Sequence, residues 1–303
     1  MREVGRRQGG GRAGAGYGRI GVSAELTAVL ENLYRCFDFR EWVPPDPLQF
    51  LYGYPDPADM EIVALLCSCL AYGRVAQIVG NLRKILGLLG AHPSRLLRET
   101  SRDRLLSMLG RAGHRFARGT DIALLLWGAS HLQRDHESLG NALSCYGSSE
   151  GLLGGLERLV EELLARSGLG RNHLLPRPSG GSACKRLMLL TRWMVRHDRV
   201  DPGGWGHLGR ENLIVPLDTH MYHAGRALGF TDRRSRDLRT AQEVTEGFAR
   251  IRPDDPVRYD FALTRFGIRK ELDRDELIGM LREYCSGDGA GSRPAETGRG
   301  HRA

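Results

Sequence analysis

Apolar residues recur at helical spacing along most of this chain, and that periodicity limits the folds that it can adopt. The clearest run lies between residues 75 and 89 and stops at Gly90, with apolar side chains three or four positions apart: Val75, Ile78, Val79, Leu82, Ile85, Leu86 and Leu89. No stretch offers several alternating strands joined by hairpin turns. The sequence therefore predicts an all-α fold.

Helix-start signals place individual helices in this fold. Asp56 followed by Pro57 is typical of an N-cap with proline at the first helical position, and it predicts a helix over residues 58–72. Asp255 followed by Pro256 repeats the signal. Further helices are predicted at 94–109, 116–133, 151–166, 183–197, 219–228, 241–250, 256–266 and 273–284.

The two ends of the chain differ in composition from its centre. Residues 1–22 and 286–303 are rich in Gly and Arg and poor in apolar residues, which predicts disordered tails. Four arginines in the first twelve residues could attract phosphates weakly, but a solvated tail is the simpler interpretation. Residues 23–285 remain as the folded helical part, either one domain with two lobes or two small domains.

The balance of charge narrows the class of partner. The 303 residues are 41% hydrophobic and carry a formal net charge of +8. This excess favours an acidic partner, of which nucleic acid is the commonest, through non-specific attraction to phosphates. No apolar run reaches the roughly 18 residues that a membrane span needs, and no signal-peptide pattern opens the chain. We therefore expect no membrane association.

The cysteines carry no metal or disulfide signature. Six of them are scattered without a C-x-x-C pair: Cys36, Cys67, Cys69, Cys145, Cys184 and Cys285. This spacing argues against a disulfide framework, a zinc site and an iron–sulfur cluster, and it favours reduced thiols. We expect a cytoplasmic protein that needs no metal and no cofactor and acts as a monomer.

A glycine-rich loop leads into the helix predicted at 183–197 and to Lys185. The loop, residues 167–182, ends in Gly180-Gly181-Ser182, and such a loop lets backbone N–H groups approach a phosphate near a helix N-terminus. The loop and helix together form a hairpin over about residues 172–196.

Basic residues form a stripe along that helix. Lys185, Arg192 and Arg196 lie at positions i, i+7 and i+11, while Leu187, Leu190 and Met194 lie on the other side and are expected in the core. The stripe suits contact with a DNA backbone. A solvated helix face that follows a flexible loop explains the same spacing and stays open.

Asp218 stands at the predicted start of the helix over 219–228, after an apolar approach over residues 213–217. Capping alone accounts for an aspartate at this position. A carboxylate held by backbone donors can also stabilise positive charge that develops nearby. His220, His223 and Arg226 follow and suit phosphate binding, although each histidine alone is as readily structural. Neither histidine has the surroundings of a zinc site.

Lys185 and Asp218 lie 33 positions apart, and a loop-borne amine with a positioned carboxylate is a minimum set for covalent chemistry at an electrophilic carbon. At these two segments the chain resembles the helix-hairpin-helix DNA glycosylase superfamily. Val215-Pro-Leu-Asp-Thr-His-Met-Tyr-His-Ala is similar to a run of the 8-oxoguanine glycosylases. The long gap between lysine and aspartate is most like their archaeal branch.

The hairpin itself departs from the superfamily pattern. This chain has Leu175-Pro-Arg-Pro-Ser-Gly-Gly-Ser-Ala-Cys-Lys where the superfamily usually has Leu-Pro-Gly-Val-Gly-x-Lys, and the four-cysteine loop of the endonuclease branch is absent. The chain also resembles an uncharacterised bacterial family over about residues 25–272. The motifs are Ala71-Tyr-Gly-Arg, Gly181-Ser-Ala-Cys-Lys-Arg, Pro216-Leu-Asp-Thr-His and Asp255-Pro-Val-Arg-Tyr-Asp-Phe-Ala.

The glycosylase resemblance implies a fold, a partner and a set of roles. The fold is two helical lobes with the active site in the cleft between them, and the partner is damaged duplex DNA at the nucleoid. Lys185 matches the lysine that attacks the sugar, Asp218 the essential aspartate, and His220 the histidine that contacts a phosphate. The activity implied is removal of an oxidised base through a lysine Schiff base, followed by strand cleavage.

Other side chains are candidates for binding DNA. Gln77 lies in the neighbourhood where a superfamily glutamine probes the DNA. The candidate contacts to the DNA backbone are His223, Arg177, Arg186, Arg192, Arg226 and Arg233, with Gly180 and Gly181 in the hairpin. Tyr259, Phe261, Ala262 and Phe266 are candidates for the base pocket, and an ordinary helix core explains these four equally well.

Three other functions remain open from the residues alone. The chain could bind nucleic acid in the same fold without catalysis, and its binding would then not depend on Lys185. It could be a helical interaction scaffold whose basic residues are only solvated. It could also use Lys185 as a Schiff-base lysine on a small carbonyl compound, although the basic excess argues against that substrate class.

Overall fold

The computed structural model describes residues 23–170 and 172–286, and within these ranges the protein is helical with no β-strand, which confirms the all-α prediction. Short 3₁₀ helices lie at Arg40–Trp42 (η1), Pro47–Gly53 (η2), Pro178–Gly180 (η3) and Arg210–Asn212 (η4). The α-helices are α1 Ala24–Phe37, α2 Pro57–Cys69, α3 Val75–Leu89, α4 Pro93–Glu99, α5 Arg102–Leu109, α6 Gly119–His136, α7 Leu139–Gly147, α8 Gly151–Ser167, α9 Lys185–Val195, α10 Thr219–Ala227, α11 Leu238–Ala249, α12 Asp260–Ile268 and α13 Arg274–Ser286.

The two proline-based start signals have different outcomes. Asp56 caps α2 as predicted, since its carboxylate accepts hydrogen bonds from the N–H groups of Ala58 and Asp59. The same prediction at Asp255 is wrong. Its buried carboxylate accepts hydrogen bonds from the Arg196 guanidinium, and α12 begins only at Asp260.

Two helices and one break were not predicted. The helix expected at 94–109 is two helices, because Ser101 caps α5 and Thr100 before it is extended. The sequence patterns did not predict the helices α1 and α7. In α7 the glycine at position 140 has a packing reason, since a Cβ there would lie 2.5 Å from the Trp205 indole ring.

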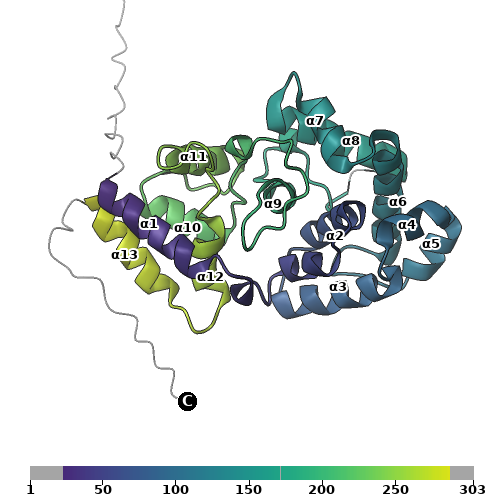
Figure 1. Ribbon diagram of the computed structural model, residues 1–303, viewed down its shortest axis with the longest axis horizontal. Helices are drawn as coiled ribbons and strands as arrows, with labels where there is room; N and C mark the ends of the chain where they lie inside the picture. The colour runs from purple at the N-terminus through teal and green to yellow at the C-terminus, as the bar shows by residue number, and fades with distance from the viewer. Residues whose placement is uncertain (1–22, 171, 287–303) are drawn as a thin grey trace, which may run out of the picture.

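The α-helices form two groups on either side of α9 (Figure 1). In one group α1, from the N-terminal end, packs against α12 and α13, and α10 joins them with α11. In the other group α6 and α7 pack against α8, and α2 packs against α4 and α6. The helix α9 packs on α2 and lies between the groups. The chain therefore leaves the first group after α1 and returns to it at α10.

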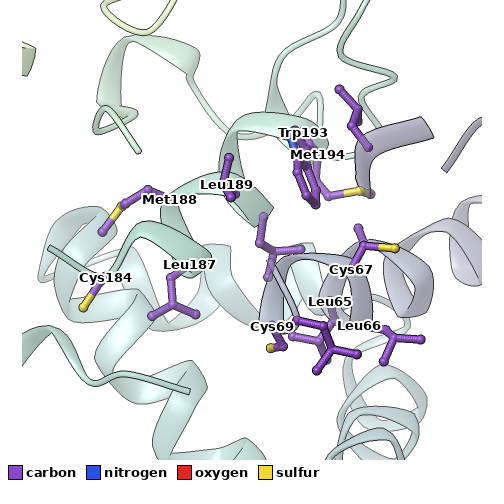
Figure 2. Packing of buried hydrophobic residues seen from close by; sticks show 14 of the residues in the cluster. Leu65, Leu66, Cys67, Cys69, Cys184, Leu187, Met188, Leu189, Trp193 and Met194 are labelled. Carbon is purple, nitrogen blue, oxygen red and sulfur yellow. The ribbon is translucent and has the colours of Figure 1, made fainter. Parts of the chain in front are cut away.

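Helix α9 is buried along almost its whole length. Every residue from position 187 to 195 is buried, so the helix has no exposed basic face. Figure 2 shows Leu187 and Trp193 of α9 in one apolar cluster with Cys67 and Cys69 of α2. Because packing density in such a core fixes side-chain positions, α9 is a rigid support for Lys185 at its N-terminal end.

Buried ion pairs hold the C-terminal half of α9 in place. The Arg192 guanidinium donates to both carboxylate oxygens of Asp201 at 2.9 and 3.1 Å and to Asp260. Arg196 pairs with Asp198, Asp201 and Asp255. Burial alone would lower the pKa of Arg192, but Asp201 and Asp260 outweigh it and raise that pKa, so the guanidinium stays charged. The predicted DNA-facing stripe is therefore wrong at Arg192 and Arg196.

No helix among the described residues is long and apolar enough to cross a membrane. The predicted disordered tails fall almost wholly outside the described residues, since α13 extends through residue 286 and the description begins at residue 23.

Candidate active site

Lys185 and Asp218 meet although 33 residues separate them. The Lys185 Nζ lies 3.4 Å from the Asp218 Oδ2, and their side chains are 36% and 17% exposed. The amine is thus partly open to solvent while the carboxylate is mostly covered. This arrangement differs from the buried pairs farther along α9 because one partner remains accessible.

Local geometry explains how both groups reach this point. Lys185 is the first residue of α9, and Cys184 before it adopts a left-handed conformation with φ of 46° that turns the loop into the helix. Asp218 caps α10, since its Oδ1 accepts from the N–H groups of His220 and Met221 at 2.9 Å. One carboxylate oxygen therefore caps the helix, and the other faces the amine.

A cavity of about 330 Å³ opens beside this pair. The α2–α3 connection supplies the walls Ala71 and Tyr72, and the start of α3 supplies Val75 and Ile78. Its polar residues come from the start of η2, from α9, and from α10 and α12 of the first group; they are Asp46, Lys185, Arg192, Asp218, His220, Asp260, Thr264 and Arg265. The cavity combines apolar walls with converging charged groups, as small-molecule sites commonly do.

A second hollow adjoins the cavity on the surface. It measures about 460 Å³ and is lined by Ala71, Tyr72, Phe116, His173, Lys185 and Arg186. We call it the surface groove. Lys185 and Tyr72 line both spaces, so the amine lies where the groove meets the cavity.

Asp260 is the most unusual acid in the cavity. Its Oδ2 accepts from Arg192, while its buried Oδ1 accepts no hydrogen bond within the described part of the chain. Burial raises the pKa of Asp260 to about 6; Arg192 opposes that shift and Asp218 adds to it. A buried acceptor without a donor is costly, which makes Asp260 a candidate for contact with whatever occupies the cavity.

Close packing against α12 fixes His220. A Cβ at Gly267 would lie 1.9 Å from the His220 Nδ1, so only glycine at 267 admits the imidazole in this position. That Nδ1 is buried and makes no hydrogen bond to the described residues. His220 lines the cavity and also a polar hollow formed by residues 266–275. It therefore stands between the cavity and a polar surface of mixed charge that includes Arg269, Lys270 and Glu271.

Of the residues predicted to contact DNA, Arg186 lies near Lys185 and Gln77 does not line the groove or the cavity. Arg186 lines the surface groove, donates to the carbonyl oxygens of Cys69 and His173, and lies 5.2 Å from the centre of the Tyr72 ring. Gln77 is exposed on α3, whereas neighbouring Val75 and Ile78 line the cavity.

The hairpin glycines lie away from both spaces. Gly180 and Gly181 are exposed, and neither lines the cavity or the surface groove. Gly181 has a φ of +73°, which favours glycine, and its carbonyl oxygen accepts from the Leu238 N–H at 3.1 Å. In this structure the glycines shape the loop and its contact with the start of α11.

The prediction that Arg192 contacts DNA is wrong. It is 3% exposed and paired on both sides with buried carboxylates, so it cannot reach a DNA backbone. Arg177 is engaged by Glu157 and Glu161 of α8, and Arg233 by Asp237. The partners of Arg192 come from segments that only the fold brings to α9.

His223 and Arg226 are exposed on α10, where a backbone contact is sterically open. Burial, then Arg274 and Arg236, lower the pKa of His223, so its ring is neutral at pH 7. A neutral ring binds phosphate as a hydrogen-bond donor rather than as a cation.

The predicted base-pocket residues do not line the cavity. Tyr259, Phe261 and Ala262 are buried core residues, and Phe266 faces the neighbouring polar hollow. The same helix instead contributes Asp260, Thr264, Arg265 and Ile268 to the cavity. The cavity is therefore lined by a different face of α12 from the one that the prediction named.

Sequence reasoning missed several residues that the structure places around Lys185. Tyr72 and Asp260 lie inside motifs quoted above, and these motifs could have drawn attention to them. Asp46, His173, Phe116 and Arg265 carried no such signal. Within the described ranges, no cluster of three or more His, Cys, Asp or Glu residues could hold a metal ion.

A family model described as "Protein of unknown function (DUF2400)" matches residues 46–269. The matched segment contains Lys185, Asp218 and Asp260. Comparison with curated proteins and with solved structures found no match. The match is to an uncharacterised family, and the resemblance to DNA glycosylases stays a prediction.

Proposed function

The chain belongs to this family of unknown function, and we propose that the protein is a DNA glycosylase and AP lyase that removes an oxidised base through a Schiff base on Lys185. The observation that carries the proposal is the contact between the Lys185 Nζ and the Asp218 Oδ2 at the mouth of the cavity. The resemblance at these two motifs supplies the reaction class.

The arrangement of helices supports the proposal. The two helix groups with a cavity between them suit the two-lobed glycosylase-like fold that the resemblance implies, with α9 carrying the lysine. A cavity of about 330 Å³ has room for a single nucleobase, and a side chain inside it cannot reach a nucleotide that stays stacked in a duplex. The substrate nucleotide must therefore leave the base stack, at a cost of a few kcal/mol.

In the proposed reaction Lys185 loses a proton to solvent through the surface groove and attacks C1′ of the extruded nucleotide. The N–C1′ bond forms as the glycosidic bond breaks, and the base leaves with the bonding electron pair and takes up a proton from water. Ring opening gives a protonated Schiff base. Loss of a C2′ proton then expels the 3′-phosphate by β-elimination, and hydrolysis frees the amine.

Asp218 has two roles in this proposal. Its Oδ2 steadies the positive charge that develops on the sugar, and its capping bonds to α10 keep it from moving during the reaction. The rigid packing of α9 holds the amine in line, and such positioning accounts for a large share of enzymatic rate enhancement.

The proposed DNA-binding surface combines residues of the surface groove and the cavity with exposed residues of α3 and α10. Arg186 at the groove, His220 beside Gly267, and the exposed His223 and Arg226 of α10 are its proposed phosphate contacts, with Gln77 on α3 facing the duplex. The formal net charge of +8 supplies non-specific attraction to the same partner.

The test is a panel of duplexes that carry single oxidised bases or abasic sites, incubated with the wild type and with Lys185→Gln. We expect the wild type to release one class of base and to nick the strand, and Lys185→Gln to lose at least about 10³-fold in rate. Duplex binding without base release in both proteins would replace the proposal with non-catalytic DNA binding. Activity retained in Lys185→Gln would refute the assigned nucleophile.

A further inference from the structure

A tight turn displays an aromatic ring beside the proposed site. The N–H of His114 donates to the carbonyl oxygen of Ala117 at 2.8 Å, and the Ala117 N–H donates back to His114 at 2.9 Å. Phe116 at the tip is 73% exposed, the largest value among the exposed large hydrophobic residues of the described chain. A single exposed apolar ring is common on protein surfaces, so what points to a partner here is the place of Phe116 in the lining of the surface groove.

The turn is fixed to the connection between α2 and α3. His114 is 1% exposed, and its Nε2 donates to the Tyr72 carbonyl oxygen at 2.9 Å while its Nδ1 accepts from Asn81 at 3.0 Å. The Tyr72 hydroxyl donates back to the His114 carbonyl oxygen at 2.9 Å. Several hydrogen bonds therefore hold the turn that carries Phe116 against the α2–α3 connection.

Arg115 packs into the same support. Its φ is 54°, and its guanidinium lies 5.5 Å from the centre of the Phe116 ring. A Cβ at Gly73 would lie 2.6 Å from the Arg115 Nη1, so a glycine there lets the arginine lie close to the α2–α3 connection. The turn thus places one aromatic ring and one cation side by side.

The chemistry of the surface groove suits an unpaired nucleotide. Phe116, Tyr72 and His173 supply aromatic rings, Arg186 and Lys185 supply positive charge, and none of the six lining residues is acidic. The His173 ring meets both Phe116 and Tyr72 edge-on, at 6.3 and 5.9 Å between centres. Aromatic faces that alternate with cations are the usual platform for unstacked bases and their phosphates.

We infer that Phe116 enters the duplex next to the extruded nucleotide and stacks on the base that loses its neighbour, while Arg115 and Arg186 hold the flanking phosphates. Apolar side chains act as such wedges where a protein unstacks a base step. The inference rests on the DNA-binding part of the proposed function and does not depend on attack by Lys185. Phe116 and Lys185 line the same groove, and Lys185 also lines the cavity, so the proposed wedge lies close to the nucleotide that would occupy the cavity.

The experiment measures binding in a Lys185→Gln background, so that turnover does not alter the DNA. Fluorescence anisotropy compares a duplex that contains a tetrahydrofuran abasic analogue with a fully paired duplex of the same sequence. We expect Phe116→Ala to weaken binding to the abasic duplex by about tenfold, or about 1.4 kcal/mol, and to leave binding to the paired duplex within about twofold. Phe116→Trp should retain the preference.

Phe39→Ala is the matched control, because Phe39 is also exposed (38%) and also lies under a guanidinium, that of Arg199, but lines neither space. Equal loss on both duplexes, no loss on either, or the same loss in Phe39→Ala would overturn the inference, as would absence of DNA binding. Selective loss in Phe116→Ala together with a wild type that removes no base would uphold the wedge and refute base removal.

Discussion

The two ends of α9 carry the same kind of interaction in opposite surroundings. At the N-terminal end Lys185 meets one carboxylate at 3.4 Å and stays 36% exposed. At the other end Arg192 and Arg196 are 3% exposed and bound by four aspartates. The helix therefore begins with a cation that solvent can reach and ends at two buried cations that fix its position.

This contrast teaches that charge on a helix does not by itself indicate a binding face. Exposed pairs contribute little to stability because water competes for both partners. Buried pairs have already lost their water, so each partner depends on the other. We therefore assign chemistry to Lys185 and structural support to Arg192 and Arg196.

The largest expected effect is a difference in the free energy of unfolding between a variant of buried Arg192 and a variant of partly exposed Lys185. Arg192→Met should lower the free energy of unfolding by about 3–5 kcal/mol, because it leaves buried Asp260 without its cation and removes one of the two guanidinium groups that pair with buried Asp201. Lys185→Met should change it by less than about 1 kcal/mol. Urea denaturation of the two variants beside the wild type measures both values, and similar losses in the two variants would erase the distinction.

A smaller effect is expected from Asp260, the buried partner of Arg192, as a dependence of stability on pH. Since burial raises the folded-state pKa of Asp260 to about 6, above an unfolded value of about 3.9, protonation stabilises the fold. This stabilisation is complete below the unfolded pKa and disappears as the pH rises through 6.

The wild type should therefore gain about 1 kcal/mol relative to Asp260→Asn between pH 7 and pH 5. Denaturation series for both proteins at several pH values check this gain. A difference between them that stays constant with pH would show that Asp260 does not titrate in this range.

Local signals were the part of the fold that the sequence could reveal. Asp56 and Asp218 cap helices through N–H groups two and three residues away, so a short motif contains the whole interaction. Asp255 carries the same Asp-Pro signal, but its carboxylate is taken by Arg196, 59 residues distant. Competition from a distant partner cannot be read from a local pattern.

In the candidate site, too, the sequence revealed the residues that local motifs mark and missed those that distant contacts define. Lys185 and Asp218 were found because motifs mark them, and the structure brings them into contact. Arg192 was misassigned because its partners Asp201 and Asp260 lie on other segments. Phe116 carried no motif, and only the anchored turn distinguishes it from an ordinary exposed residue.

The central claim is that the Lys185 amine forms a covalent bond with the sugar of a damaged nucleotide. The sequence contains three lysines, and Lys84 and Lys270 are exposed and offer matched Gln variants. Borohydride reduction with abasic and oxidised duplexes, followed by peptide mapping, tests the claim most directly. We predict one adduct on Lys185 that survives Lys84→Gln and Lys270→Gln and is lost in Lys185→Gln. No adduct on any duplex, or an adduct on either exposed lysine, would contradict it.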